Sequence, residues 1–146
     1  MKLVIAEKPS VGNSIARMIG ADRQRGDGFT SGNGYIVSWC FGHLVALSSP
    51  EEYDKRYAKP RKLSNTLPII PEEFRWTVAE STAPQFEKLK ALMERPDVDE
   101  IICATDAGRE GECVFRYVYC QAGCTKPFKR LWISSMTDEA IRDGFE

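Results

Sequence analysis

The segment KLVIAEKPSVGNSIARMIG, residues 2–20, predicts how this chain folds. Its apolar run at residues 2–6 is short and unbroken, which is typical of a strand buried on both faces of a parallel sheet. Pro9 suits the first turn of the helix that follows, because a missing amide hydrogen does no harm there. Gly20 is placed to end that helix. A strand followed at once by a helix is the repeating unit of α/β proteins.

The rest of the chain continues this alternation. Residues 22–34 contain many turn-forming residues, and residues 48–76 are irregular and too long for a simple connection, which indicates a functional loop. Apolar patterns predict a strand within 35–47 with a loop or short helix after it, a helix at 81–95, a strand at 98–105, a helix at 109–123, a strand at 129–135 and a final helix capped by Thr137. We therefore expect one α/β domain, residues 1–146, with a mostly parallel central sheet of about four strands and helices on both faces.

Composition is ordinary for a folded protein, with 42% apolar and 28% charged residues among 146. No apolar run approaches the ~18 residues that a membrane span needs, and the N-terminal run is too short for a secretory signal. We expect a monomer in the cytoplasm. Because the net charge is −1, any nucleic-acid binding must come from a local cluster of basic residues.

Cysteine and histidine usage excludes several kinds of site. The five cysteines are odd in number and form no CxxC pair, so neither a disulfide framework nor a zinc site is indicated. Cys103 and Cys113 fall in apolar patterns and are expected to be buried thiols. His43 is the only histidine, which excludes a multi-histidine metal site and favours a structural role for this side chain.

The segment ATDAGREGE, residues 104–112, places Asp106, Glu110 and Glu112 close together. Asp106 follows one predicted strand, and Glu7 follows the first. If these strands are neighbours in the sheet, both carboxylates reach the crevice where open α/β sheets bind ligands. Carboxylates without histidine are hard oxygen ligands that suit Mg²⁺. The expected metal ligands are Glu7, Asp106 and Glu110.

A structural interpretation of the same residues stays open. Asp106 could cap the following helix, while Glu110 and Glu112 could simply favour its positive end. Glu7 could be a surface turn residue and Lys8 a solvated lysine. In the functional interpretation, Lys8 adds a positive charge suited to a phosphodiester oxygen.

Basic residues are concentrated at 55–62, KRYAKPRK, with Tyr53 and Tyr57 among or beside them. Basic groups with aromatic rings suit single-stranded DNA, through phosphate contacts and base stacking. The alternative is a solvated loop. Arg109 either neutralises the acids or meets a phosphate. The candidates for DNA contact are Lys8, Arg56, Lys59, Arg61 and Arg109.

Five groups of residues follow one another in a recognisable order: LVIAEKPS, then GDGF with SGNGYIVSWCFGHLVAL, then LPIIPEEF, ATDAGREGE and KRLWISSMTDEAI. Together they resemble the N-terminal Toprim domain of type IA DNA topoisomerases, most of all the bacterial topoisomerase III branch. The resemblance covers nearly the whole chain and implies the Rossmann-like Toprim fold.

The resemblance also implies a chemistry. Such enzymes change DNA linkage without ATP: a tyrosine attacks one strand to form a 5′-phosphotyrosyl link, another strand passes through, and the break is resealed. Glu7 would assist proton transfer at the 3′-hydroxyl, and Lys8 would stabilise the scissile phosphate. The acidic cluster of the family, DxDxE, binds Mg²⁺; its first acid here is Asp106 and its last is Glu110.

Two departures from the family pattern stand out. Gly108 replaces the middle acid, so we expect one metal site built from Glu7 and Asp106, with Glu110 as a close or water-mediated partner. No segment matches the motif of the nucleophilic tyrosine, and the tyrosines present fall in structural patterns. We therefore expect a fragment that needs the remaining domains of its enzyme and is inactive alone. The tryptophans are expected in the core or at domain contacts: Trp39, Trp76 and Trp132.

Two other classes of protein remain as alternatives. Another Toprim enzyme, such as a small nuclease or a primase-like protein, could act without a tyrosine, although LPIIPEEF and RLWISSMTDEAI argue against it. A receiver-like α/β module could accept a phosphoryl group in its acid pocket. That module would need a lysine on a later strand, whereas Lys8 adjoins Glu7 at the first.

Overall fold

The computed structural model describes residues 1–58 and 67–146. The strands within this part of the chain are β1 (Lys2–Ala6), β2 (Gln24–Gly26), β3 (Phe29–Gly32), β4 (Tyr35–Trp39), β5 (Val45–Leu47), β6 (Trp76–Val78), β7 (Glu100–Ala104) and β8 (Phe128–Arg130). The helices are α1 (Pro9–Ile19), α2 (Pro50–Tyr53), α3 (Ala83–Glu94), α4 (Arg109–Gln121) and α5 (Asp138–Phe145), with single 3-10 turns at Lys55–Ala58 and Glu80–Thr82.

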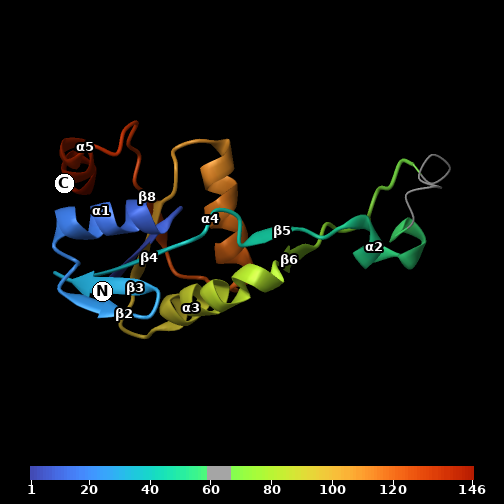
Figure 1. Ribbon diagram of the computed structural model, residues 1–146, viewed down its shortest axis with the longest axis horizontal. Helices are drawn as coiled ribbons and strands as arrows, with labels where there is room; N and C mark the ends of the chain where they lie inside the picture. The colour runs from blue at the N-terminus through green and yellow to red at the C-terminus, as the bar shows by residue number, and fades with distance from the viewer. Residues whose placement is uncertain (59–66) are drawn as a thin grey trace.

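Six of these strands form one sheet in the order β2-β3-β4-β1-β7-β8 (Figure 1). β1 lies near its centre and runs parallel to both β4 and β7. β8 runs parallel to β7 at one edge, while β3 and β2 add an antiparallel hairpin at the other. The expected α/β class with a mostly parallel central sheet is confirmed.

Helices cover both faces of the sheet. Alternate residues of β1 point to opposite faces, so they pack against different helices. Leu3 and Ile5 belong to a buried cluster that includes Leu89 of α3 and Phe115 of α4. Val4 and Ala6 belong to a second cluster with side chains from α1 and α5, among them Ile15 and Ile141. Burial on both faces explains the unbroken apolar run at residues 2–6.

The helix ends follow the local signals. Pro9 occupies the first turn of α1, and Gly20 ends this helix in the left-handed conformation with φ 69°, where its amide lies at the carbonyls of Ala16 and Arg17. Thr137 caps α5, because its side-chain oxygen accepts a hydrogen bond from the amide of Ala140 at 3.3 Å.

The number of strands differs from the expectation. The central sheet has six strands rather than about four, because the turn-rich segment 22–34 contains the β2–β3 hairpin. Strands of three and four residues beside glycines carry too short an apolar pattern to be recognised. β3 is held in place by pairing with β4, and β2 by pairing with β3. The strand expected at 129–135 is confined to Phe128–Arg130.

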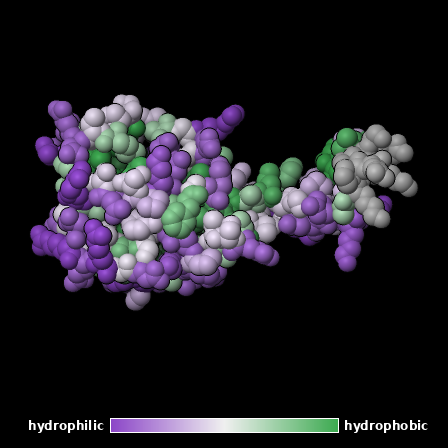
Figure 2. All heavy atoms as spheres, in the orientation of Figure 1, coloured by the Kyte–Doolittle hydropathy of each residue, from purple (hydrophilic) through white to green (hydrophobic). Residues whose placement is uncertain are grey.

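Residues 45–58 and 67–78, from β5 to β6, form an arm that extends from the body of the molecule (Figure 1). β5 and β6 pair as a separate two-stranded antiparallel sheet at its base. Several of its apolar side chains are exposed: Leu47, Leu67, Ile70, Phe74 and Trp76. Hydrophobic groups are visible along the arm in Figure 2. The expected irregular segment is therefore a projecting structure and not a simple connection.

Several expectations for single residues can be compared with the structure. Cys103 is buried, as expected, whereas Cys113 is only half-buried. Trp132 does not belong to the core, because it is 76% exposed. Tyrosine side chains make structural contacts: the Tyr119 hydroxyl donates to the carbonyl of Lys126 at 2.6 Å, and the Tyr117 ring packs against Trp76.

Candidate active site

The carboxyl end of β1 carries Glu7 and Lys8 into the turn before α1. The backbone of this turn is held from the loop after β4, since the amide of Cys40 donates to Ala6 at 2.8 Å and that of Gly42 donates to Glu7 at 3.1 Å. Glu7 is half-buried and Lys8 is exposed. The two side chains therefore stand at the end of a central strand, with Lys8 open to a ligand.

β1 and β7 are neighbours, and their register brings the two acidic segments together. Ala6 pairs with Ala104, so Glu7 and Asp106 leave the sheet at the same edge. The amide of Asp106 donates to Oε2 of Glu7 at 3.1 Å, although the two residues are 99 positions apart. The two strand ends therefore lie together, in contact through the Asp106 backbone and the Glu7 carboxylate.

A close backbone approach shapes the turn that carries Asp106. A Cβ atom placed on Gly111 would lie 2.2 Å from the carbonyl oxygen of Asp106 and 2.8 Å from its amide nitrogen. The buried hydroxyl of Thr105 donates to the carbonyl of Gly111 at 2.7 Å, which ties the end of β7 to the first turn of α4. Only glycine at position 111 lets the turn and the helix come this close.

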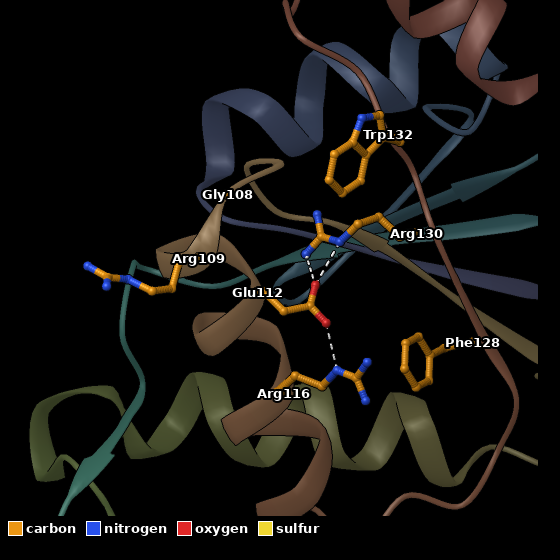
Figure 3. Close-up of a pocket in the computed structure, with 7 residues that line it drawn as sticks. All are labelled: Gly108, Arg109, Glu112, Arg116, Phe128, Arg130 and Trp132. Carbon is orange, nitrogen blue, oxygen red and sulfur yellow. Dashed lines mark hydrogen bonds and ion pairs between the residues drawn. The ribbon is translucent and has the colours of Figure 1, made fainter.

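Arg130 of β8 is the positive group that lies among these segments, and sequence reasoning missed it. Its guanidinium donates to the carbonyls of Thr105 at 2.9 Å and Asp106 at 3.3 Å. It also donates through Nε to Oε2 of Glu112 at 2.7 Å, and its side chain is only 15% exposed. Figure 3 shows this pair at the centre of a cavity. No local pattern marked this residue, because its contacts depend on the register of β8 against β7.

Glu112 is shared between two arginines. Arg116, one helical turn further along α4, donates to its Oε1 at 2.7 Å, and Arg130 holds the other oxygen. The hydrogen bond from Arg116, followed by the one from Arg130, lowers the pKa of Glu112 below its usual value. Glu112 is therefore a structural anion of the site and not a free ligand.

The neighbouring thiols are not nucleophiles. Burial raises the pKa of Cys40 to about 12, with smaller contributions from Cys103 and Glu7. Burial also raises the pKa of Cys103. Both thiols stay protonated near neutral pH and serve as small apolar groups behind the site.

The remaining predicted site residues lie further out. Nε2 of His43 lies 3.5 Å from Oε1 of Glu110, whose side chain is 82% exposed. Arg109 makes no hydrogen bond or ion pair with the acids within residues 1–58 and 67–146. Arg56 lies on the arm, paired with Asp54 at 2.8 Å and stacked over Tyr57. Lys59 and Arg61 lie outside the described residues.

The donor set is compatible with Mg²⁺ but is not a closed cage. Within the described residues, no three histidine, cysteine, aspartate or glutamate side chains gather closely enough to hold a metal ion. Glu7 and Asp106 nevertheless place two carboxylates at one strand edge. Mg²⁺ commonly binds one or two carboxylates and completes its six positions with waters and substrate phosphate. The residues present fit that mode of binding.

The fold and this pair of strand ends define a Toprim domain, and the chain belongs to the Toprim family, whose model matches residues 2–136. It is 51% identical over 145 residues to the DNA topoisomerase 3 of Shouchella clausii, covering 99% of this chain and 20% of that protein. It is also 51% identical over 143 residues to the DNA topoisomerase 3 of Bacillus anthracis, covering 98% of this chain and 19% of that protein.

A solved structure shares the fold at lower sequence identity. The full-length topoisomerase I of Thermotoga maritima superposes with a TM-score of 0.62 at 20% identity, over 98% of this chain and 20% of that one. The chain thus spans about a fifth of the length of the relatives that it matches. No helix within residues 1–58 and 67–146 is long and apolar enough to cross a membrane.

Proposed function

We propose that this chain is the catalytic Mg²⁺-binding domain of a type IA DNA topoisomerase. In this proposal it supports ATP-independent cleavage of one strand, strand passage and religation, and a tyrosine outside these 146 residues is the nucleophile. The observation that carries the proposal is the contact of Asp106 with Glu7 at 3.1 Å. It joins the two acidic segments that follow β1 and β7.

Glu7 is the proposed proton-transfer group. Its Oε2 accepts the amide hydrogen of Asp106, which orients the carboxylate. A carboxyl group fixed in this way can, when protonated, give its proton to the leaving 3′-oxygen, and the resulting carboxylate can take the proton of the 3′-hydroxyl during religation. Lys8 stands beside it, exposed, and can stabilise the charge that develops on the scissile phosphate.

Glu7 and Asp106 are the proposed ligands of Mg²⁺, with Glu110 as a close or water-mediated partner. The bound ion would act as a Lewis acid that orients a phosphate oxygen and neutralises its charge. Arg130 holds the backbone of Asp106, and Glu112 neutralises Arg130. The Arg130–Glu112 pair therefore positions Asp106 without competing with it for the metal ion.

DNA contacts are proposed for Lys8, Arg56, Lys59, Arg61 and Arg109. The exposed positions of Lys8 and Arg109 beside the acids support a role at a phosphate. Arg56 supports a contact further away, on the arm, where its guanidinium already lies over the ring of Tyr57. We expect the substrate to be a single-stranded segment and the enzyme to work as a monomer in the cytoplasm.

A chimera tests the proposal. Replacing the matching N-terminal residues of the Bacillus anthracis DNA topoisomerase 3 with this chain should give an enzyme that relaxes negatively supercoiled plasmid with Mg²⁺. Glu7→Gln should lower the rate at least ~100-fold, in the range lost with a general acid–base group. The matched control is Glu87→Gln, an exposed acid of α3, which should leave the rate unchanged.

Two results would contradict the proposal. One is a Glu7→Gln chimera that is as active as the unsubstituted chimera. The other is relaxation by the 146-residue chain alone, because the proposed nucleophile lies outside it. The first result would exclude Glu7 from the mechanism, and the second would exclude the external tyrosine.

A further inference from the structure

One side of β8 and its continuation carries two aromatic rings separated by an arginine. Side chains alternate along an extended strand, so Phe128, Arg130 and Trp132 project to the same side. Leu131 projects to the other and is buried, at 4% exposure. β8 is an edge strand of the sheet, so among residues 1–58 and 67–146 its outer edge pairs with no further strand.

A cavity of about 460 Å³ lies between this side of β8 and the start of α4, lined by Gly108, Arg109, Glu112, Arg116, Phe128, Arg130 and Trp132 (Figure 3). Its volume falls in the range of small-ligand clefts, ~300–1,000 Å³. Trp132 stands at its rim and is 76% exposed. A large aromatic ring with this exposure offers an open face on which a flat ligand can stack.

The cavity carries positive charge. Arg116 and Arg130 share the single carboxylate of Glu112, which leaves an excess of positive charge between the rings. Arg130 is largely buried, whereas the Arg116 side chain is half-exposed and its guanidinium lies 4.5 Å over the ring of Phe128. A phosphate can therefore approach Arg116. In Figure 3 the Arg109 side chain points away from the central pair and adds charge beside it.

Aromatic faces and guanidinium groups in one groove match the chemistry of single-stranded nucleic acid, in which bases stack and phosphates pair with arginine. The groove also adjoins the candidate active site, because Gly108 and Arg109 of the acidic segment line it. We propose that this groove binds a nucleotide of the single strand that flanks the cleavage site, with its base on Trp132 and its phosphate near Arg116. The inference rests on the proposed function and names a further binding residue for its substrate.

The test is the affinity of the 146-residue chain for a fluorescein-labelled dT12 oligonucleotide, measured by anisotropy at ~50 mM salt. Trp132→Ala should weaken binding about tenfold, within the range expected for the loss of one base stack. Trp132→Phe retains an aromatic face and should restore most of the affinity. Arg116→Gln should weaken binding and lower the slope of log affinity against log salt by about 0.7, the value for one lost phosphate contact on a single strand.

The control is Glu87→Gln, which changes an exposed side chain of α3, outside both the groove and the arm. It should bind dT12 like the unsubstituted chain. Equal affinities for Trp132→Ala and the unsubstituted chain, or no binding of dT12 by the unsubstituted chain, would overturn the inference and assign Trp132 to a protein contact.

Failure of this inference differs from failure of the proposed function. If the chimera relaxes plasmid but Trp132→Ala leaves dT12 binding unchanged, only the inferred nucleotide groove is excluded. If dT12 binding depends on Trp132 but the chimera is inactive, the inferred groove is supported and the proposed function is excluded.

Discussion

Replacing Gly111 with alanine sets two physical effects against each other. Gly111 lies in the first turn of α4, and in a helix alanine is favoured over glycine by about 1 kcal/mol. On that basis Gly111→Ala would stabilise the protein. The structure predicts the opposite, because the new Cβ would lie 2.2, 2.8 and 2.9 Å from three backbone atoms of Asp106.

The size of the effect follows from those contacts. Backbone atoms cannot rotate away as a flexible side chain can, so either the Asp106 turn or the start of α4 must shift. Overpacking of this kind costs about 1–3 kcal/mol, and three crowded backbone atoms favour the upper end. After the gain in helix propensity, we expect Gly111→Ala to lower the free energy of unfolding by about 2 kcal/mol, or the Tm by about 5–10 °C.

Urea unfolding followed by circular dichroism measures the difference, with Gly108→Ala as the matched control. Gly108 has extended backbone with φ −152°, and a Cβ there would meet no atom within 4 Å. Its replacement should change the free energy of unfolding by less than about 0.5 kcal/mol. A Gly111→Ala protein as stable as the unsubstituted chain would refute the reasoning, because the close approach to Asp106 would then not constrain the turn.

Two further predictions concern the charges of the site. Gly108→Asp should add a carboxylate, in open space, to the proposed set of Glu7, Asp106 and Glu110, and should tighten Mg²⁺ binding about tenfold. Calorimetric titration should show this gain, and Asp106→Asn should abolish it. Glu112→Gln should destabilise the protein by about 1–2 kcal/mol at pH 7, because the half-exposed carboxylate loses two charged hydrogen bonds. Since its folded pKa lies below the unfolded value of about 4.3, this contribution is present above that pH and is lost as the pH falls through the folded pKa. Unfolding curves of the two proteins should therefore converge in acid, and a constant difference down to the lowest pH would contradict the assignment.

Local signals predicted the elements whose stability depends on neighbours in sequence. Pro9, Gly20 and Thr137 act within a single helical turn, and the structure places each at the helix end expected for it. The alternation of buried strand and helix was sufficient for the α/β class. The β2–β3 hairpin was not predicted, because its strands have only three and four residues and depend on tertiary pairing, β3 with β4 and β2 with β3.

Some residues of the candidate site could likewise be predicted from local signals, and others could not. The pattern of residues identified Glu7 and Asp106 as acids at strand ends, and neighbouring parallel strands then bring such ends together. Arg130 could not be assigned from the pattern, because its partners depend on the register of β8 against β7, in which Arg130 pairs with Cys103. A shift of that register would direct the guanidinium elsewhere.

The sequence by itself determined which residues could carry the chemistry, since a strand end, a helix cap and a carboxylate are local properties. Only the tertiary structure decided what neutralises the acidic segment: Arg130 and Arg116 share Glu112, while Arg109 makes no ion pair with the acids within the described residues. The physical reason is that Arg130 and its partners are far apart in the sequence. Electrostatic and hydrogen-bonding partners are set by which strands pair and in which register, and pairing between segments far apart in the chain leaves no local pattern.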